Sequence, residues 1–94
     1  MFFEWDTKKN YINYRKHGIT FEEAVSVFYD DNAIVFDDPI HSVEEERYLI
    51  LGYNYDMKML IVSHCYKKDE LHLRIISARK ATKSEEMFYY RNNA

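Results

Sequence analysis

Three β-rich runs with only short turns between them constrain the fold most: residues 47–55, 58–66 and 71–77. A tight turn near Asp56 and Met57 joins the first two runs, and residues 67–70 turn the chain into the third. The third run alternates cleanly. Its apolar set, on one face of the strand, is Leu71, Leu73 and Ile75, and the other face carries His72, Arg74 and Ile76. Short connections of this kind predict an antiparallel meander.

Two helices are expected before this meander. Asp6 is suited to cap the first helix, which runs to about Lys16, and Gly18 suits the left-handed position just past its end. Thr20 and Glu23 form a capping box at the start of the second helix. The apolar residues of that helix recur at i, i+3, i+4 and i+7 as one stripe: Phe21, Ala24, Val25 and Phe28.

The remaining segments complete an α+β domain. Residues 1–5 are short and aromatic, which is typical of an edge strand or an apolar arm, and residues 33–37 are a further strand candidate. A loop with three consecutive glutamates follows, and a second capping box at Thr82 begins a last helix that reaches about Arg91. We therefore predict a single domain, with two N-terminal helices packed on one face of an antiparallel sheet and a closing C-terminal helix.

The composition agrees with one folded domain. Of the 94 residues 47% are hydrophobic and 17% aromatic, which supplies a core, and 2 Gly with 1 Pro leave little material for linkers. The longest apolar run is strand-sized, far below the ~20 residues that span a bilayer. The N-terminus lacks the basic-then-apolar order of a signal peptide, and a single cysteine cannot form an internal disulfide. We therefore expect a cytoplasmic protein without membrane contact.

The net charge of −3 is unevenly distributed along the chain. Residues 1–56 hold 5 Lys/Arg against 12 Asp/Glu, a net −7, and residues 57–94 hold 8 against 4, a net +4. This asymmetry is compatible with an anionic ligand on one face, and equally with basic and acidic segments that complement each other. Composition alone does not indicate a nucleic-acid-binding protein.

Several kinds of site are not indicated by the sequence. His41, His64 and His72 show no i, i+4 pairing and form no cluster of zinc ligands. Cys65 lies in an apolar strand run, where a buried inert thiol is expected rather than a nucleophile. No glycine-rich loop is available for a nucleotide phosphate. We therefore expect neither a metal nor a cofactor.

Five short motifs in collinear order resemble the BrnT family of toxins. They are FEWD at 3–6, N..KHG at 13–18, FEEA..VF at 21–28, EER at 45–47 and RIISARKA at 74–81. The last motif is the most specific, and together they cover nearly the whole chain. The resemblance implies a RelE-like fold and a ribonuclease toxin of a type II toxin–antitoxin system. It also implies a small DNA-binding antitoxin that neutralises the toxin and represses the operon with it.

Metal-free RNA cleavage needs cationic donors for the phosphorane-like charge, a base for the 2′ proton and an acid for the leaving oxygen. Arg74 and Arg79 are the leading candidates for the donors, because a planar guanidinium matches two phosphate oxygens at once. They lie in and just after the last strand. The resemblance thus implies transition-state stabilisation by these two arginines.

The position of Arg74 on its strand supports this assignment. Alternation places it opposite the apolar set, on the face away from the presumed helix layer. With a symmetric turn between the last two strands, Arg74 lies across from Ser63, and His72 across from Cys65. The alternative interpretation is that Arg74 pairs with an acidic side chain such as Glu45 and stiffens the sheet.

Lys16 and His17 end the first helix, where the helix dipole favours a general acid or a phosphate-binding cation. The alternative is that His17 only caps free carbonyls before Gly18. Arg47 follows three glutamates, so it is either a substrate cation or the partner of that acidic run. The base is unassigned, with Glu45 as a weak candidate. Two further cations near the end of the last strand are candidates for substrate binding: Lys80 and Lys83.

Three classes of function stay open. The first is a ribonuclease that cleaves RNA and inhibits translation and growth. The second is a catalytically weak or inactive module that binds its antitoxin in an operon-repressing complex, and the third is a toxin of the same fold that acts on a protein. An isoelectric point near 5.8 argues against strong general affinity for RNA. We also expect the free toxin to expose aromatic side chains at Phe2, Phe3, Trp5 and the tyrosines of the last helix, and to self-associate without the antitoxin. Operator DNA is expected to be contacted only through the antitoxin.

Overall fold

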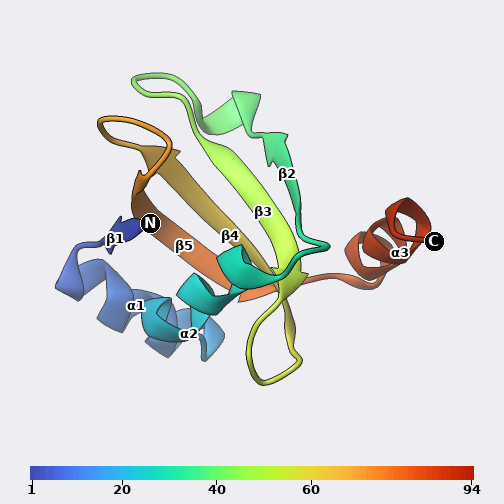
Figure 1. Ribbon diagram of the computed structural model, residues 1–94. Helices are drawn as coiled ribbons and strands as arrows, with labels where there is room; N and C mark the ends of the chain where they lie inside the picture. The colour runs from blue at the N-terminus through green and yellow to red at the C-terminus, as the bar shows by residue number, and fades with distance from the viewer.

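The computed structural model describes residues 1–94, which form one five-stranded sheet with helices on both of its faces (Figure 1). The strand order across the sheet is β1-β5-β4-β3-β2. Helices α1 and α2 lie on one side of the sheet and α3 lies on the other. The elements in chain order are β1 (Phe2–Glu4), α1 (Thr7–His17), α2 (Phe21–Val25), η1 (Ser26–Tyr29), β2 (Ile34–Asp37), η2 (Pro39–His41), β3 (Tyr48–Tyr53), β4 (Met59–Tyr66), β5 (His72–Lys80) and α3 (Lys83–Asn92).

Helix α1 begins and ends where its capping residues predict. The Asp6 side chain accepts hydrogen bonds from two amides of the first turn, at 2.8 and 3.2 Å. Gly18 takes a left-handed conformation, with φ of 71°, and donates its amide to the Tyr14 carbonyl at 2.8 Å. A residue without Cβ adopts this conformation without strain. The chain therefore turns sharply after His17 and leaves that residue at the helix end.

The second helix departs from the predicted pattern after one turn. Its capping box is present, with Thr20 and Glu23 each bonded to the other's backbone amide. The chain then continues as the 3-10 helix η1, in which residues three apart share a face. Val27 is therefore buried together with Phe21, whereas Val25 is only half-buried. The predicted apolar stripe is correct at Phe21 and Ala24, which are buried, and Phe28 packs half-buried against the core. The prediction is wrong at Val25.

The sheet is mixed rather than purely antiparallel. Strands β2 to β5 are antiparallel to their neighbours, as predicted, but β1 runs parallel to β5. Of the two interpretations of residues 1–5, the edge strand is correct. Phe2 pairs with His72 and stacks on its ring with centroids 4.8 Å apart. The first strand thus finds its partner near the other end of the chain, and no local sequence pattern encodes that pairing.

The pairing between β4 and β5 differs from the one that a symmetric turn predicts. Arg74 lies across from Cys65, and not from Ser63. Cys65 is therefore not the partner of His72, whose carbonyl accepts a hydrogen bond from the Lys67 amide at 2.8 Å. The connection takes up two more residues than a symmetric turn at 67–70, because Tyr66 pairs with Leu73 and not with Leu71. The register near the turn shifts accordingly.

A β-bulge at Ile76 shifts the register again. Successive residues of β4 pair with Ile75 and Ser77, which leaves Ile76 as an extra residue in β5. Because side chains alternate along a strand, an extra residue reverses the faces of the residues that follow. Ala78 consequently enters the core beside α1 and α2, and Arg79 points to the opposite face.

Two apolar clusters, one on each face of the sheet, hold the layers together. Cys65 is buried as predicted, and burial raises the pKa of its thiol. The cluster beneath α1, α2 and η1 contains Ile19, Phe21, Ala24, Val27, Ile50, Leu60, Val62, Ile75 and Ala78. The cluster beneath α3 contains Leu51, Met59, Ile61 and Tyr89.

The aromatic side chains expected at the surface are exposed only in part. Phe2 and Tyr90 are exposed, whereas Phe3 and Trp5 are half-buried and Tyr89 is buried. The exposed aromatic surface is therefore smaller than predicted, because Phe3 and Trp5 pack against the larger core cluster. None of the three α-helices is long and apolar enough to cross a membrane.

Candidate active site

A cavity of about 250 Å³ opens on the face of the sheet opposite α1 and α2. Side chains of β3, β4 and β5 form its floor, and the end of α1 and the segment containing η2 contribute to its walls. Two imidazoles, two guanidiniums and one carboxylate line it. The lining residues are His17, Asp38, His41, Arg47, Leu49, Ile61, Ser63, Ile76, Ser77, Ala78 and Arg79.

A buried asparagine brings His17 to this cavity. The Asn13 amide nitrogen donates to the carbonyls of Ile19 and Ala78, both at 2.9 Å, and its oxygen accepts from the Ala78 amide at 3.1 Å. The side chain thus pairs with β5 as a further strand would, where β1 no longer covers the edge. His17 lies four residues later on the same face of α1. The helix end is therefore fixed at the edge of the sheet, beside the cavity.

The second histidine of the cavity is held by an aspartate. In η2, Pro39 occupies the first turn, where its fixed φ suits the start of a helix. Nδ1 of His41 lies 3.0 and 2.9 Å from the two carboxylate oxygens of Asp38. The Asp38 side chain is 13% exposed and the His41 side chain 64% exposed. A carboxylate at Nδ1 favours the tautomer whose Nε2 accepts a proton.

Asp38 and His41 are a pair that the sequence motifs did not predict. Their i, i+3 spacing around Pro39 is the signal that was available, because a proline in the first turn predicts a short helix that brings both side chains together. The i, i+4 spacing that is typical of metal-binding histidines does not reveal this pair.

Arg47 lies in the cavity wall without a partner. Its side chain makes no hydrogen bond or ion pair, and its Nε is buried. The backbone of the same residue is fixed, because its amide donates to Ser42 Oγ at 2.9 Å and its carbonyl accepts from the Asp38 amide at 3.0 Å. The alternative that Arg47 pairs with the preceding glutamates is therefore wrong. Its guanidinium is available to an anion in the cavity.

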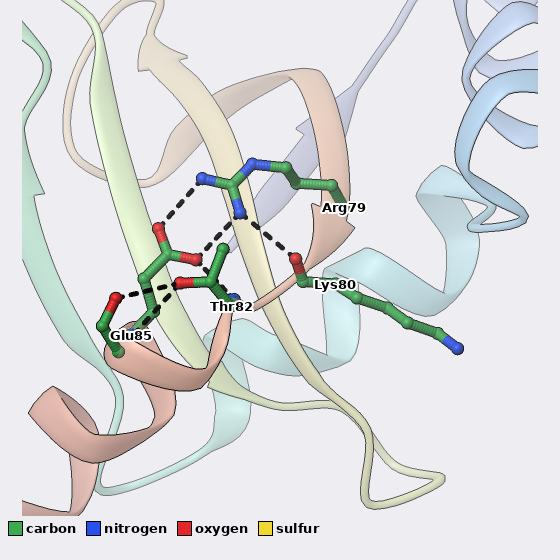
Figure 2. Close-up of polar contacts among 5 residues, drawn as sticks. Arg79, Lys80, Thr82 and Glu85 are labelled. Carbon is green, nitrogen blue, oxygen red and sulfur yellow. Dashed lines mark hydrogen bonds and ion pairs between the residues drawn. The ribbon is translucent and has the colours of Figure 1, made fainter.

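Arg79 reaches the cavity from β5 with its terminal nitrogens already paired (Figure 2). Nη1 and Nη2 donate to the two carboxylate oxygens of Glu85 at 2.8 and 2.9 Å, and Nη1 also donates to the Lys80 carbonyl at 3.2 Å. Glu85 also accepts from the Thr82 amide at the start of α3. The guanidinium lowers the pKa of Glu85 to about 2, and the carboxylate raises the pKa of Arg79. Arg79 is thus a fixed positive charge.

Arg74 lies outside this cavity. It lines an adjoining pocket of about 290 Å³, which shares Arg47 and Ile76 with the cavity. Nε of Arg74 lies 3.5 Å from the Glu4 carboxylate of β1, so its acidic partner is Glu4 and not Glu45. Glu45 also lines the adjoining pocket. The two arginines that were predicted to stabilise one transition state therefore line different pockets.

The cavity brings together some of the predicted site residues and not others. Those that line it are His17, Arg47 and Arg79. Those that do not are Lys16, Arg74, Lys80 and Lys83. Figure 2 shows the Lys80 side chain directed away from the Arg79 guanidinium. The three lysines are exposed.

The lining groups supply acid–base chemistry and positive charge. Two imidazoles on one small cavity are able to exchange protons with a bound group, and two guanidiniums stabilise an anion. Ser63 and Ser77, which pair across β4 and β5, add hydroxyl donors to the floor. The chain contains no group of three His, Cys, Asp or Glu side chains placed to hold a metal ion.

The fold and the cavity define a small α+β protein with an arginine- and histidine-lined site on one face of a mixed five-stranded sheet. A family model described as the ribonuclease toxin BrnT of type II toxin–antitoxin systems matches residues 5–85. The chain therefore belongs to the BrnT family of ribonuclease toxins, which confirms the resemblance seen in the sequence motifs. Membership of a type II system also implies an antitoxin partner.

A solved structure supports the same fold. The chain is similar to the 1.1 Å crystal structure of the ribonuclease toxin BrnT from Brucella abortus, with a TM-score of 0.68. The two are 23% identical in sequence, and the similarity covers 88% of this chain and 100% of the other. A comparison with curated proteins gives no match.

Proposed function

We propose that this toxin cleaves RNA in the cavity, without a metal ion, through a 2′,3′-cyclic phosphate. The observation that carries the proposal is the meeting of His17, His41, Arg47 and Arg79, from four separate segments of the chain, on one cavity. Two imidazoles and a cation around one phosphate are sufficient for transesterification of RNA. This assignment replaces Glu45 as the base.

His41 is the base of the proposed reaction. Asp38 holds its Nδ1, so Nε2 faces outward with a free lone pair. Nε2 takes the proton of the ribose 2′-hydroxyl, and the 2′ oxygen attacks phosphorus. The P–O2′ bond forms as the P–O5′ bond breaks, which gives a cyclic phosphate and a 5′-hydroxyl end.

His17 is the acid of the same reaction. It occupies the last residue of α1 and lines the cavity. It donates its proton to the leaving 5′ oxygen, on the opposite side of the phosphate from His41. A helix end held by Asn13 keeps this imidazole in place throughout the step.

Arg47 is the principal phosphate ligand, because its guanidinium has no competing partner. Arg79 adds a fixed positive charge whose terminal nitrogens stay on Glu85. Arg74, in the adjoining pocket, contacts a neighbouring phosphate of the RNA rather than the one that reacts. The three lysines outside the cavity contribute only to general attraction of RNA.

The remaining proposals follow from family membership. The RNA substrate is mRNA, and its cleavage inhibits translation and growth in the cytoplasm. The fold is RelE-like and the chain acts as a single domain. The antitoxin is a small DNA-binding protein that represses the shared operon, and the toxin self-associates when the antitoxin is absent, through exposed side chains such as Phe2 and Tyr90.

Arginine variants test the site. Arg47→Ala is expected to lower the rate of RNA cleavage about 10² to 10³-fold, the usual cost of removing one preorganised donor to a developing oxyanion. Arg74→Ala is expected to lower it less than tenfold, because Arg74 lines a different pocket. Cleavage of a labelled RNA is measured in EDTA and in magnesium, with the folding of each variant checked by circular dichroism.

Two results would contradict the proposal. If purified toxin leaves RNA intact in EDTA and in magnesium, the ribonuclease assignment to this chain fails. The chain is then an inactive module that binds its antitoxin. The pairing of both terminal nitrogens of Arg79 with Glu85 agrees with that alternative. If Arg74→Ala costs more than Arg47→Ala, the reacting phosphate lies in the adjoining pocket instead.

A further inference from the structure

A second pocket, of about 710 Å³, lies where η1, the β3–β4 hairpin and the end of α3 meet. We call it the tyrosine pocket. It shares no lining residue with the catalytic cavity, and no lysine, arginine or histidine lines it. Its tyrosines are Tyr29, Tyr53, Tyr55, Tyr89 and Tyr90.

A carboxylate without a cation lies in this pocket. Asp30 Oδ2 accepts hydrogen bonds from the Tyr53 amide at 2.9 Å and from the Tyr89 hydroxyl at 2.8 Å. No basic side chain lies within 4 Å of it, since it takes part in none of the ion pairs of the chain. The close approach depends on Gly52, because a Cβ there would meet Asp30 Oδ2 at 2.9 Å. The fold therefore makes room for this charge and leaves it uncompensated.

The aromatic walls hold one another in place. The rings of Tyr53 and Tyr89 meet edge to face with centroids 5.5 Å apart, and those of Tyr89 and Tyr90 meet likewise at 5.6 Å. The hydroxyls of Tyr53 and Tyr90 contact each other. Burial and the bond to Asp30 raise the pKa of Tyr89 to about 12, so this hydroxyl remains a neutral donor.

We propose that the tyrosine pocket binds an arginine side chain of the antitoxin. A guanidinium is attracted to the faces of tyrosine rings, stacks on them through its planar group, and gains from a carboxylate that pairs with no other cation. The charge of the pocket favours a cationic protein side chain over an RNA phosphate as its ligand. The N-terminal 56 residues carry a net −7 and provide Asp30, whereas an RNA phosphate would find no cation here and would be repelled by Asp30.

This inference rests on family membership, which implies an antitoxin, and not on the cleavage mechanism. An arginine bound at the tyrosine pocket leaves the residues of the catalytic cavity untouched. Binding is measured without any RNA being cleaved, so its failure and the failure of the ribonuclease proposal are separate results.

The test uses N-acetyl-L-arginine amide, with the neutral isostere N-acetyl-L-citrulline amide as its control. Ring resonances of the tyrosines are followed by NMR as each compound is added to the full-length toxin. The arginine compound is expected to bind with a millimolar Kd and to shift resonances of the pocket tyrosines, and the citrulline compound about tenfold more weakly. Equal shifts from both compounds, or none from either, would overturn the proposal.

Tyrosine variants localise the binding. Tyr90→Ala and Tyr55→Ala, both exposed enough to leave the core intact, are each expected to weaken it about fivefold. Tyr14→Ala is the matched control, because Tyr14 of α1 is 52% exposed and Tyr90 is 53% exposed. Equal loss in the Tyr14→Ala control would place the binding elsewhere.

Two further arms identify the occupant. In the toxin–antitoxin complex purified from its own operon, the arginine compound is expected to shift none of these resonances, because the antitoxin already fills the pocket. Undiminished binding in the complex would overturn the antitoxin as occupant. A short single-stranded RNA is expected to leave the same resonances unchanged in the free toxin, and a saturable shift with RNA would assign the pocket to nucleobases instead.

Discussion

His41 and His72 each lie three residues after an aspartate. His41 follows Asp38 and His72 follows Asp69, and Nδ1 lies 2.9 Å from a carboxylate oxygen in both pairs. Only His41 lines the cavity that holds Arg47. The aspartate–histidine pair alone therefore does not distinguish a catalytic group from a surface contact. What distinguishes the two histidines is the cation beside one of them, and this makes His72 an internal control for His41.

The Arg79–Glu85 pair predicts how stability changes in acid. The pKa of Glu85 in the folded protein is about 2, against its usual 4.5, so the unfolded chain takes up a proton first as pH falls. The stabilisation is full above pH 4.5 and is lost between pH 4.5 and 2. We expect about 1 kcal/mol, because the pair is partly exposed and water screens it.

Urea denaturation across that range checks the prediction, with Glu85→Gln as the variant. Glutamine also serves in a capping box, so the start of α3 is preserved. The variant should lose less stability than wild type between pH 4.5 and 2, whereas Glu86→Gln, its neighbour, should follow wild type. Parallel curves for wild type and Glu85→Gln would contradict the ion pair.

At the scale of elements, β5 is the strand that builds the cavity. Its bulge at Ile76 sends Ser77 and Arg79 to the open face, and the Asn13 amide takes the place of a neighbouring strand beside Ala78. The same asparagine fixes the end of α1. The position of His17 and the path of β5 are therefore linked through one buried side chain.

Asn13→Ala is expected to destabilise the fold by about 3 kcal/mol. The substitution leaves the buried amide and carbonyl of Ala78 and the carbonyl of Ile19 without partners, and each orphaned group costs about 1 to 3 kcal/mol. Urea denaturation measures the change. Asn92→Ala, which removes one exposed bond to the Phe88 carbonyl, should cost about 0.5 kcal/mol or less. A similar cost for both variants would show that Asn13 is not a buried bridge.

The elements that could be predicted from sequence are those fixed by neighbouring residues. Asp6 with Gly18, and the two capping boxes, set the helix boundaries through bonds spanning two to four residues. The parallel pairing of β1 with β5 and the bond between Asn13 and Ala78 join residues more than sixty positions apart, and the bulge at Ile76 is marked by no capping or turn residue. The register of β5, and with it the separation of Arg74 from Arg79, was therefore not predictable from local patterns.

At the scale of the whole molecule, we expect burial of His64 to cause a second loss of stability, at a higher pH than the loss that involves Glu85. It is fully buried against Phe28 and Tyr48, and its Nε2 has no partner. Burial lowers the pKa of His64 below its usual 6.5, so the unfolded chain binds a proton that the folded protein excludes. Stability contributed by the neutral imidazole is therefore full above pH 6.5 and falls as pH drops below it.

His64→Leu removes this titration and fills a similar volume. The free energy of unfolding of wild type should fall between neutral pH and about pH 5, and that of the variant should fall less. The slopes with pH are compared, not the absolute stabilities, because leucine changes the core as well. Equal slopes would show that the folded protein accommodates the imidazolium.

The molecule as a whole carries two separate candidate sites, and the sequence pointed to them unequally. The collinear motifs identified the family, because a series of motifs can be recognised without knowing how the strands pair. His17, Arg47 and Arg79, which the sequence indicated as candidates, all line the cavity, but their meeting with His41 depends on the path of the loop before β3. The tyrosine pocket was not predictable, since its walls come from three distant segments.

The central claim is that RNA is cleaved in the cavity with His41 as the base. The most direct measurement is the rate of RNA cleavage, in EDTA, by wild type, His41→Ala and His72→Ala toxins of equal folded content. We predict a loss of about 10² to 10⁴-fold for His41→Ala, the usual contribution of a general base, and less than a twofold change for His72→Ala. Equal activity of His41→Ala and wild type, or equal losses in the two variants, would contradict this account.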